Sequence, residues 1–318
     1  IETHAYLSDK IVDFYNKNFS GNEVSAELKN YLIDGSRRED DVPRWMNHFY
    51  DPVNNRGLSY DPAIDPLNLG AWEQSKNWAN NENNQNKLIY KVPATIASIL
   101  TAFEQKKISD ISSETNFTWQ KAIEYWLKGE KEKAMFSLGH VLHLIEDASV
   151  PDHTRNDPHP GDSPYEKWTS KFTLENPDSG LAGRLGNKKP FVLDDLNSYF
   201  DGLATYSNNN FYSKDTIGIQ SGYKLPEPDY TKQDGKFFYA FKKDFNDKDY
   251  RLFVYKRYFG SVLLSSKIDI ELSIAEDGNK TLQDYWFRLS IKSVQYGAGI
   301  IDLFFKEVEK AKNNPDFI

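Results

Sequence analysis

The segment at residues 131–148 constrains the fold of this 318-residue chain more than any other. Its apolar residues recur on nearly every side of a helix instead of along one stripe, and Pro151 follows closely behind it. A helix that is apolar all round is buried in a core, and proline ends it. We therefore predict a buried central helix. Its polar residues His143 and Asp147 need a specific role, because a buried charge without a partner is costly.

Helical periodicity recurs along much of the remaining chain. We expect further helices at residues 3–18, 24–33, 67–79, 88–105, 119–127, 163–172 and 282–310. Gly35 should end the second of these helices, and Pro93 should kink the fourth. Ser163 and Glu166 have the spacing of a capping box, which marks a helix start. The last helix should pack against the central one.

The helical pattern weakens between about residues 173 and 280. Residues 173–190 and 207–235 are rich in Gly, Pro, Asn and Asp, while 237–241 and 250–255 could pair as a short β-hairpin. No long Gly/Ser/Pro linker divides the chain. We therefore predict one all-α, multi-helix domain over residues 1–318, with a loop-rich insertion that holds the hairpin.

Composition limits the classes of protein to which the chain can belong. The hydrophobic fraction of 39%, with 14% aromatic residues, is ample for a folded core. The best apolar run, residues 296–305, is interrupted by glycines and Asp302, so we expect a soluble protein. Because the chain lacks an initiator methionine and a leader, we expect a secreted or cell-envelope protein after signal removal, or a truncated chain. The net charge of −8 disfavours tight, sequence-independent binding of nucleic acid.

The chain has no cysteine, so any metal must bind to nitrogen and oxygen ligands. His143 and Asp147 are four residues apart, which places them on one face of a helix within reach of a common ion. An isolated pair of this kind is about as often a hydrogen-bonded pair within the helix. Here further candidates surround the pair: His4, His48 after the run Glu39-Asp40-Asp41, His153, and the four-residue spacing of Asp162 and Glu166. Histidine and carboxylate ligands without thiolates are typical of catalytic zinc sites.

The order of these residues resembles the zinc-dependent phospholipase C family, which is related to the fungal single-strand-specific nucleases. The resemblance rests on the segment Asn47-His48-Phe49-Tyr50-Asp51-Pro52 with an aspartate ahead of it, and on the spacing of His143, Asp147 and His153 with proline two residues before the last histidine. It covers about residues 1–170. A final His-x-x-x-Glu pair of the family corresponds here to Asp162 and Glu166.

The resemblance implies two or three zinc ions and a set of ligands for them. The implied metal ligands are Ile1, His4, Asp40, His48, His143, Asp147, His153, Asp162 and Glu166. One ion would be held by Asp40, His48 and His143, a second by His4 and the chain terminus, with Asp147 bridging the two. The third would lie on His153, Asp162 and Glu166.

The sequence departs from the family pattern at two of these positions. Asp162 stands where the family has histidine, so His159 is an alternative third ligand. Ile1 stands where the family has a tryptophan whose amine and carbonyl bind metal. Asp41 is adjacent to Asp40, and we choose Asp40 because its offset from Gly35 resembles the spacing in the family.

The function that the resemblance implies is phospholipase C-like hydrolysis of a phosphodiester by metal-activated water, with Asp40 as the catalytic ligand that orients or deprotonates the water. The implied partner is a phospholipid, with transient contact to a membrane surface, and the protein would be a monomer. A single-strand nuclease or nucleotidase of the same superfamily is one alternative. A non-catalytic surface protein with a degenerate metal cage is the other. His140, one turn before His143, could orient a ligand through its other ring nitrogen, although a core histidine is the more frequent role. Arg44 and Asp51 could support His48, although a surface arginine and a turn-forming aspartate are the more frequent roles.

Overall fold

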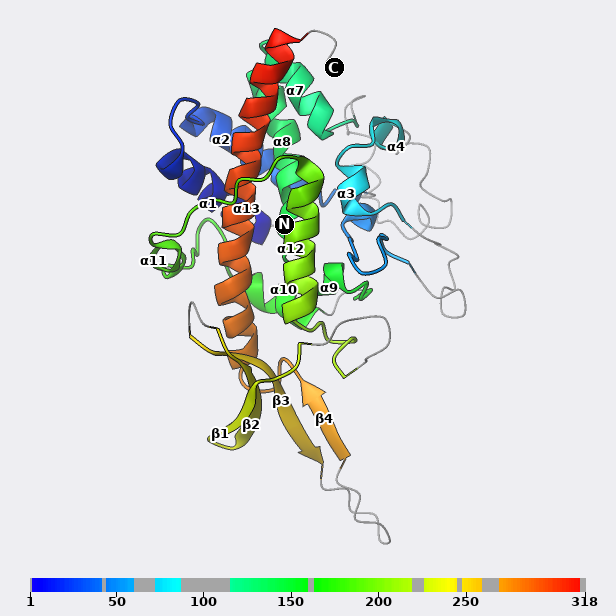
Figure 1. Ribbon diagram of the computed structural model, residues 1–318, viewed down its shortest axis with the longest axis vertical. Helices are drawn as coiled ribbons and strands as arrows, with labels where there is room; N and C mark the ends of the chain where they lie inside the picture. The colour runs from blue at the N-terminus through cyan, green and yellow to red at the C-terminus, as the bar shows by residue number, and fades with distance from the viewer. Residues whose placement is uncertain are drawn as a thin grey trace.

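The computed structural model describes residues 2–41, 44–59, 72–86, 115–159, 163–218, 226–244, 248–258 and 269–314. The helix predicted at 88–105, the first part of that at 67–79, and the candidate ligands Ile1 and Asp162 lie outside these residues. Figure 1 shows a bundle of helices beside one long helix that ends near the C-terminus, with a small sheet at the opposite end. The fold is mostly helical, as predicted.

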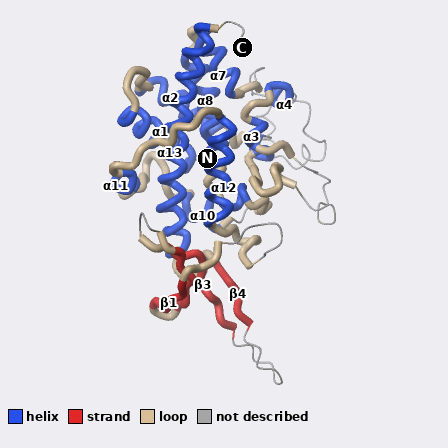
Figure 2. The backbone as a smooth tube through the Cα atoms, viewed as in Figure 1, coloured by secondary structure: helices blue, strands red, loops and turns tan. Residues whose placement is uncertain are grey.

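Helices make up most of the described elements, and the strands lie together at one end (Figure 2). In chain order, those described are α1 (Glu2–Asn18), α2 (Ala26–Arg38), the 3-10 turn η1 (Arg44–Asn47), α3 (Ser75–Trp78), α4 (Glu82–Asn86), α7 (Trp119–Leu127), α8 (Lys131–Asp147), α9 (Pro151–Thr154), α10 (Pro164–Thr169), α11 (Leu181–Leu185), α12 (Leu196–Asn210) and α13 (Lys280–Asn313). The predictions at 3–18, 119–127, 131–148, 163–172 and 282–310 are confirmed by α1, α7, α8, α10 and α13. None of the described helices has an apolar stretch long enough to cross a bilayer.

The prediction that Gly35 ends the second helix is wrong, because α2 continues to Arg38. Gly35 is used instead for a close crossing with α8. A Cβ atom at Gly35 would lie 1.9 Å from the carbonyl oxygen of Phe136, and one at Gly139 would lie 2.0 Å from that of Leu32. Two glycines thus let the backbones of α2 and α8 approach more closely than any larger residue would allow. This crossing brings the end of α2 against the face of α8 that carries His143.

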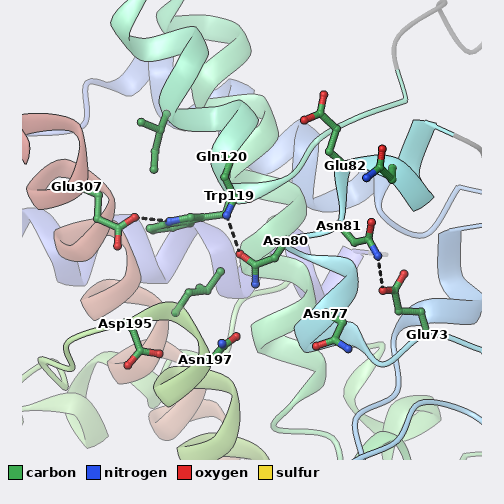
Figure 3. A pocket seen from close by; sticks show the side chains of 13 residues that line it. Glu73, Asn77, Asn80, Asn81, Glu82, Trp119, Gln120, Asp195, Asn197 and Glu307 are labelled. Atoms are coloured by element: carbon green, nitrogen blue, oxygen red, sulfur yellow. Dashed lines mark hydrogen bonds between the residues drawn. The ribbon is translucent and has the colours of Figure 1, made fainter. Parts of the chain in front are cut away.

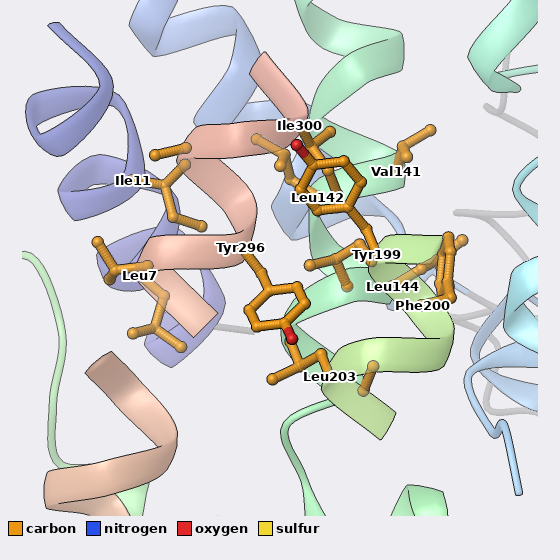
Figure 4. Packing of buried hydrophobic residues seen from close by; sticks show 14 of the residues in the cluster. Leu7, Ile11, Val141, Leu142, Leu144, Tyr199, Phe200, Leu203, Tyr296 and Ile300 are labelled. Atoms are coloured by element: carbon orange, nitrogen blue, oxygen red, sulfur yellow. The ribbon is translucent and has the colours of Figure 1, made fainter. Parts of the chain in front are cut away.

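The core lies where α8 packs among α1, α12 and α13 (Figure 4). The central helix is buried on all sides, as predicted, and its buried residues include His143, Glu146 and Asp147. Helix α13 also packs against α8, as predicted. Helix α12, which lies inside the segment that we expected to be rich in loops, contributes buried Phe200 and Leu203 to this core.

The predicted hairpin is confirmed and belongs to a larger sheet. Strands β1 (Tyr230–Asp234), β2 (Phe237–Lys242), β3 (Tyr250–Tyr258) and β4 (Asp269–Ser273) form an antiparallel meander in sequence order. The expected pairing joins β2 to β3, with Phe238 opposite Tyr255. The Tyr285 hydroxyl of α13 donates to the Leu252 carbonyl at 2.6 Å, which ties the sheet to the start of the long helix. The sheet therefore extends the helical core at one end (Figure 1).

Candidate metal centre

Four histidines from separate parts of the fold surround one buried carboxylate, that of Asp147. The distances to its two oxygens are 2.9 Å from His48 Nδ1, 3.3 Å from His143 Nε2, 3.3 Å from His153 Nδ1 and 3.4 Å from His4 Nε2. These rings come from α1, α8, α9 and the residue that follows η1. We call His4, Asp40, His48, His143 and Asp147 the inner group.

Each imidazole of the inner group is oriented through its other ring nitrogen. His143 Nδ1 lies 2.7 Å from the Ser36 carbonyl oxygen, and His48 Nε2 lies 3.2 Å from that of Glu39. Because a carbonyl only accepts, these two nitrogens carry the proton, and in the neutral ring the opposite nitrogen presents a lone pair towards Asp147. His4 Nδ1 lies 2.8 Å from the Glu146 carboxylate in the same manner. Such outer partners are typical of metal-binding histidines.

Asp40 lies at the edge of the inner group, and Asp41 does not join it. The Asp40 carboxylate lies 3.5 Å from His143 Nε2 and 3.7 Å from His48 Nδ1. The Asp41 carboxylate lies 3.6 Å from Arg38 Nη1. Of the two neighbouring aspartates, the structure brings only Asp40 to the predicted ligands.

A second group lies beside the first, nearer the surface, and we call His153, His159 and Glu166 the outer group. The Glu166 oxygens lie 3.1 Å from His153 Nε2 and 2.8 Å from His159 Nε2. His159 Nδ1 donates to the Asp157 carbonyl at 2.7 Å, which leaves Nε2 of the neutral ring with its lone pair towards Glu166. Ser163 caps α10 by accepting from the Glu166 N–H, as its spacing predicted. The sequence left either Asp162 or His159 as the third ligand beside His153 and Glu166. The structure places His159 there.

The electrostatics of the inner group favour positive charge on His143 and disfavour it on His4. Burial disfavours protonation of His143, but Asp40 and Asp147 outweigh it and raise the pKa of His143 to about 9. Burial also opposes ionisation of Asp147, yet His153 and His143 hold the pKa of that carboxyl well below its usual range. Burial, aided by the charge on His143, lowers the pKa of His4 to about 3. Buried carboxylates thus hold a proton on neighbouring imidazoles, where a metal ion could take its place.

Several buried side-chain atoms of the two groups have no hydrogen-bond partner in the described part of the chain, and a metal ion would bind to atoms of this kind. Within the described residues, His143 Nε2, His153 Nδ1 and both Asp147 oxygens are buried and have no hydrogen-bond partner, although they lie close to one another. Buried polar atoms without partners are rare because each one carries a desolvation cost. Three of the ligand sets among the described residues are His4 with His143 and Asp147, Asp40 with His48 and His143, and His153 with His159 and Glu166. Imidazole nitrogens with carboxylate oxygens suit Zn²⁺.

A cavity of about 430 Å³ opens onto both groups. Its lining includes His4, Asp40 and Asp147 of the inner group and Glu166 of the outer group. Aromatic side chains complete the wall; they are Trp45, Tyr165 and Trp286. A larger cavity of about 760 Å³ lies elsewhere, between α3, α4, α7, α12 and α13, and amide and carboxylate side chains around Trp119 line it (Figure 3). Of these two cavities, the smaller one reaches the histidines, since His4 and His153 belong to its lining.

Sequence reasoning missed two buried glutamates that support the inner group. The Glu146 carboxyl group lies 2.8 Å from His4 Nδ1 and accepts from the Ser8 hydroxyl at 2.8 Å. The signal for it was a charge within the uniformly apolar helix. Glu39 lies in the acidic run next to Asp40, and nothing local distinguishes a buried glutamate from a solvated one there.

Glu39 is held by three donors. Arg44 Nε, His140 Nδ1 and Trp78 Nε1 lie 2.6, 2.5 and 2.8 Å from its carboxylate. Of the two roles considered for Arg44, that of a surface residue is wrong, since only 4% of it is exposed. His140 packs in the core as predicted, although its ring supports Glu39. Asp51 forms a turn, as predicted, by accepting from the Val53 N–H at 3.0 Å.

Two solved structures resemble this chain weakly. An alpha toxin from Clostridium absonum aligns with a TM-score of 0.45 and 15% identity over 97% of this chain and 65% of its own. An alpha toxin from an avian strain of Clostridium perfringens aligns with a TM-score of 0.42 and 15% identity over 98% of this chain and 64% of its own. The chain therefore spans slightly less than two thirds of each toxin. No protein-family model matches the sequence, and no curated protein matches it.

Proposed function

We propose that the chain is a metal-dependent phosphodiester hydrolase that acts as a phospholipase C. The observation that carries this proposal is the convergence of four imidazoles on the buried Asp147, with ligand atoms that have no hydrogen-bond partner in the described part of the chain. Adjacent metal sites are well suited to phosphate esters, whose several negative oxygens need neutralisation during attack and departure.

The residues divide among two or three zinc ions as follows. Asp40, His48 and His143 would hold one ion, and His4 and Asp147 would contribute to a second, with Asp147 shared between the two. The outer group would hold a third, with His159 in place of the histidine that the family pattern requires. A role for Ile1 or Asp162 stays a prediction, because both lie outside the described residues.

Asp40 is the residue that we propose to act on water. When bound, divalent ions would lower the pKa of water to about 7 and neutralise the phosphoryl oxygens. Asp40 lines the cavity, and although burial opposes it, His143 and His48 hold the pKa of Asp40 below its usual value. Its carboxylate is therefore ionised at neutral pH and able to orient water or accept a proton. Glu146, Ser36 and Glu39 fix the rings that surround the reacting centre.

The composition and the cavity favour a phospholipid over a nucleic acid. The net charge of −8 opposes a polyanion with many phosphates. The aromatic wall of Trp45, Tyr165 and Trp286 suits a lipid headgroup carrying a quaternary ammonium, which binds to the face of an aromatic ring. Stacked bases would use the same rings, and this keeps a single-strand nuclease as the second candidate. We also propose that the protein is secreted and monomeric. Turnover at a lipid surface would then require transient contact with the membrane.

The first test is metal content by mass spectrometry together with hydrolysis of a phosphocholine ester and of single-stranded DNA. Two or three zinc ions per chain with ester turnover are expected. Release of nucleotides without phosphocholine would move the protein to the nuclease class. A metal-loaded protein inert towards every phosphodiester would make it a binding protein, and a chain without metal would contradict the whole proposal.

The role of Asp40 has a matched test in its neighbour. Asp40→Asn should lower the turnover, because it removes a ligand and a proton acceptor from the cavity. Asp41→Asn, which changes a carboxylate that faces Arg38, should leave turnover and zinc content unchanged. If Asp40→Asn retained full zinc and full activity, Asp40 would have no catalytic role.

A further inference from the structure

The larger cavity, of about 760 Å³, shares no lining residue with the cavity that opens onto the inner and outer groups. Its volume lies in the range of roughly 300–1,000 Å³ that is usual for small-molecule sites, although the walls of such sites are mostly apolar. Here six lining side chains carry an amide; they are Asn77, Asn80, Asn81, Asn83, Gln120 and Asn197 (Figure 3). We call this space the amide cavity. Its walls indicate a polar ligand.

The amides of the cavity include both fixed and unengaged groups. Gln120 Nε2 donates to Asn80 Oδ1 at 3.3 Å, which links α7 to the residues after α3. The side chains of Asn77 and Asn197, by contrast, make no hydrogen bond within the described part of the chain. Each amide has two donor hydrogens and one acceptor oxygen. A ligand in the cavity therefore meets donors and acceptors together.

The charges of the lining disfavour both an anion and a simple cation. Among the described residues, no lysine, arginine or histidine lines the cavity, whereas four carboxylates do, so an anion would be repelled. Most of these carboxylates are already engaged by donors of the protein. Glu73 accepts from the Asn81 amide at 2.8 Å. Glu307 accepts from Trp119 Nε1 at 2.5 Å, and Asp195 caps α12.

One part of the wall is apolar. It consists of Trp119, Ile123 and Leu196, which are all buried and are therefore held in place by packing. A sugar ring has C–H groups on its faces, which suit such a wall, and hydroxyl groups at its edge. Each hydroxyl both donates and accepts, as the amides do. A neutral polyhydroxylated ring thus matches the polar and the apolar parts of the lining together.

We propose that the amide cavity is a binding site for a neutral saccharide. The amides of Asn77, Asn197 and Gln120 contact its hydroxyl groups, and the apolar wall at Trp119 contacts a face of its ring. The inference does not depend on phosphodiester hydrolysis, because no residue of the inner or outer group lines this cavity.

The site is tested by calorimetric titration of the zinc-loaded protein with maltotriose and with diacetylchitobiose, which represent neutral hexoses and N-acetylhexosamines. We expect at least one of them to bind to one site per chain. Asn77→Ala combined with Asn197→Ala should weaken this binding roughly tenfold or more, because both amides lose their hydrogen bonds to the ligand. Zinc content and phosphodiester turnover should stay unchanged. Asn187→Ala is the matched control, because Asn187 is also exposed but does not line the cavity.

A second variant separates a saccharide from a cation. Glu82→Gln removes an exposed charge from the lining but keeps a side chain that can form hydrogen bonds, so saccharide binding should change by no more than about twofold. The saccharide should also raise the melting temperature of the original chain, a measurement that does not require a variant to fold. The proposal is wrong if neither saccharide binds, if the polycation spermidine binds in their place, or if the double variant binds the saccharide with unchanged affinity.

Discussion

The inner and outer groups differ in how the fold holds them. The rings of the inner group come from distant parts of the sequence; His48 and His143 are buried and the His4 side chain is 14% exposed. Each ring has a second partner on a packed helix or next to one. The outer group comes from residues 153–166, and 36% of the Glu166 side chain is exposed. The inner group therefore depends on the packing of α1, α2 and α8, whereas the outer group depends on a short stretch of chain. A disturbance of helix packing should affect the first and spare the second.

The largest effect is expected from Asp147→Asn. This change keeps the size of the side chain but removes the charge that four imidazoles approach. Because losing an outer partner of a ligand typically costs 10 to 100-fold, losing this shared carboxylate should cost roughly 100-fold or more in hydrolysis. Mass spectrometry should find the inner ions missing and the ion of the outer group retained. Undiminished metal content would contradict the central position of Asp147.

Gly139→Ala tests whether helix packing holds the inner group. The added methyl would lie 2.0 Å from the Leu32 carbonyl oxygen, so α2 must move away from α8 and carry the Ser36 carbonyl with it. Overpacking of this kind costs about 1–3 kcal/mol of unfolding free energy, to be measured by denaturant titration. Gly183→Ala in α11, where nothing lies within 4 Å, is the control and should not destabilise the protein. Equal stability of the two variants would mean that the crossing is not tight.

Glu146→Leu removes the carboxylate that orients His4. The variant preserves side-chain bulk but leaves His4 Nδ1 without an acceptor, and zinc affinity of the inner group should fall about 10 to 100-fold, as measured by competition with a chelator. Ser8→Ala removes only the other donor to Glu146, so its effect should be smaller. Equal effects of the two variants would show that Glu146 acts through general packing.

The smallest loss is expected from Glu166→Gln, which alters the outer group alone. The amide can still accept from one imidazole but no longer neutralises an ion, so one zinc should be lost and turnover should fall by about tenfold. Metal content and turnover, measured on one preparation, test this expectation. Loss of all ions in this variant would abolish the distinction between the two groups.

Local sequence patterns were sufficient for the elements that carry the inner group. The helix at 131–148 is recognisable because its apolar residues surround the axis, and His143 and Asp147 share a face because a helix repeats every 3.6 residues. The hairpin of β2 and β3 was equally visible from its aromatic residues. Strands β1 and β4 were missed, since a polar edge strand such as β1 has no strong alternation of its own.

Long-range contacts decided the remaining features. The neighbouring residues in the sequence predict that Gly35 ends a helix. In the fold, however, Gly35 lies inside α2, where it contacts the backbone of Phe136 on another helix. Glu39 and Asp41 have similar surroundings in the sequence, but only Glu39 meets Arg44, His140 and Trp78 in a buried network.

Local sequence patterns predict a helical protein with a buried central helix, and a set of histidines and carboxylates in the order typical of a metal centre. The tertiary structure alone decided which atoms converge on Asp147, that His159 meets Glu166, and which side chains line the amide cavity. The physical reason is the distance along the chain over which each kind of interaction acts. Periodicity and spacing act over one or two helical turns, whereas desolvation and charge pairing depend on neighbours that only the folded chain brings together.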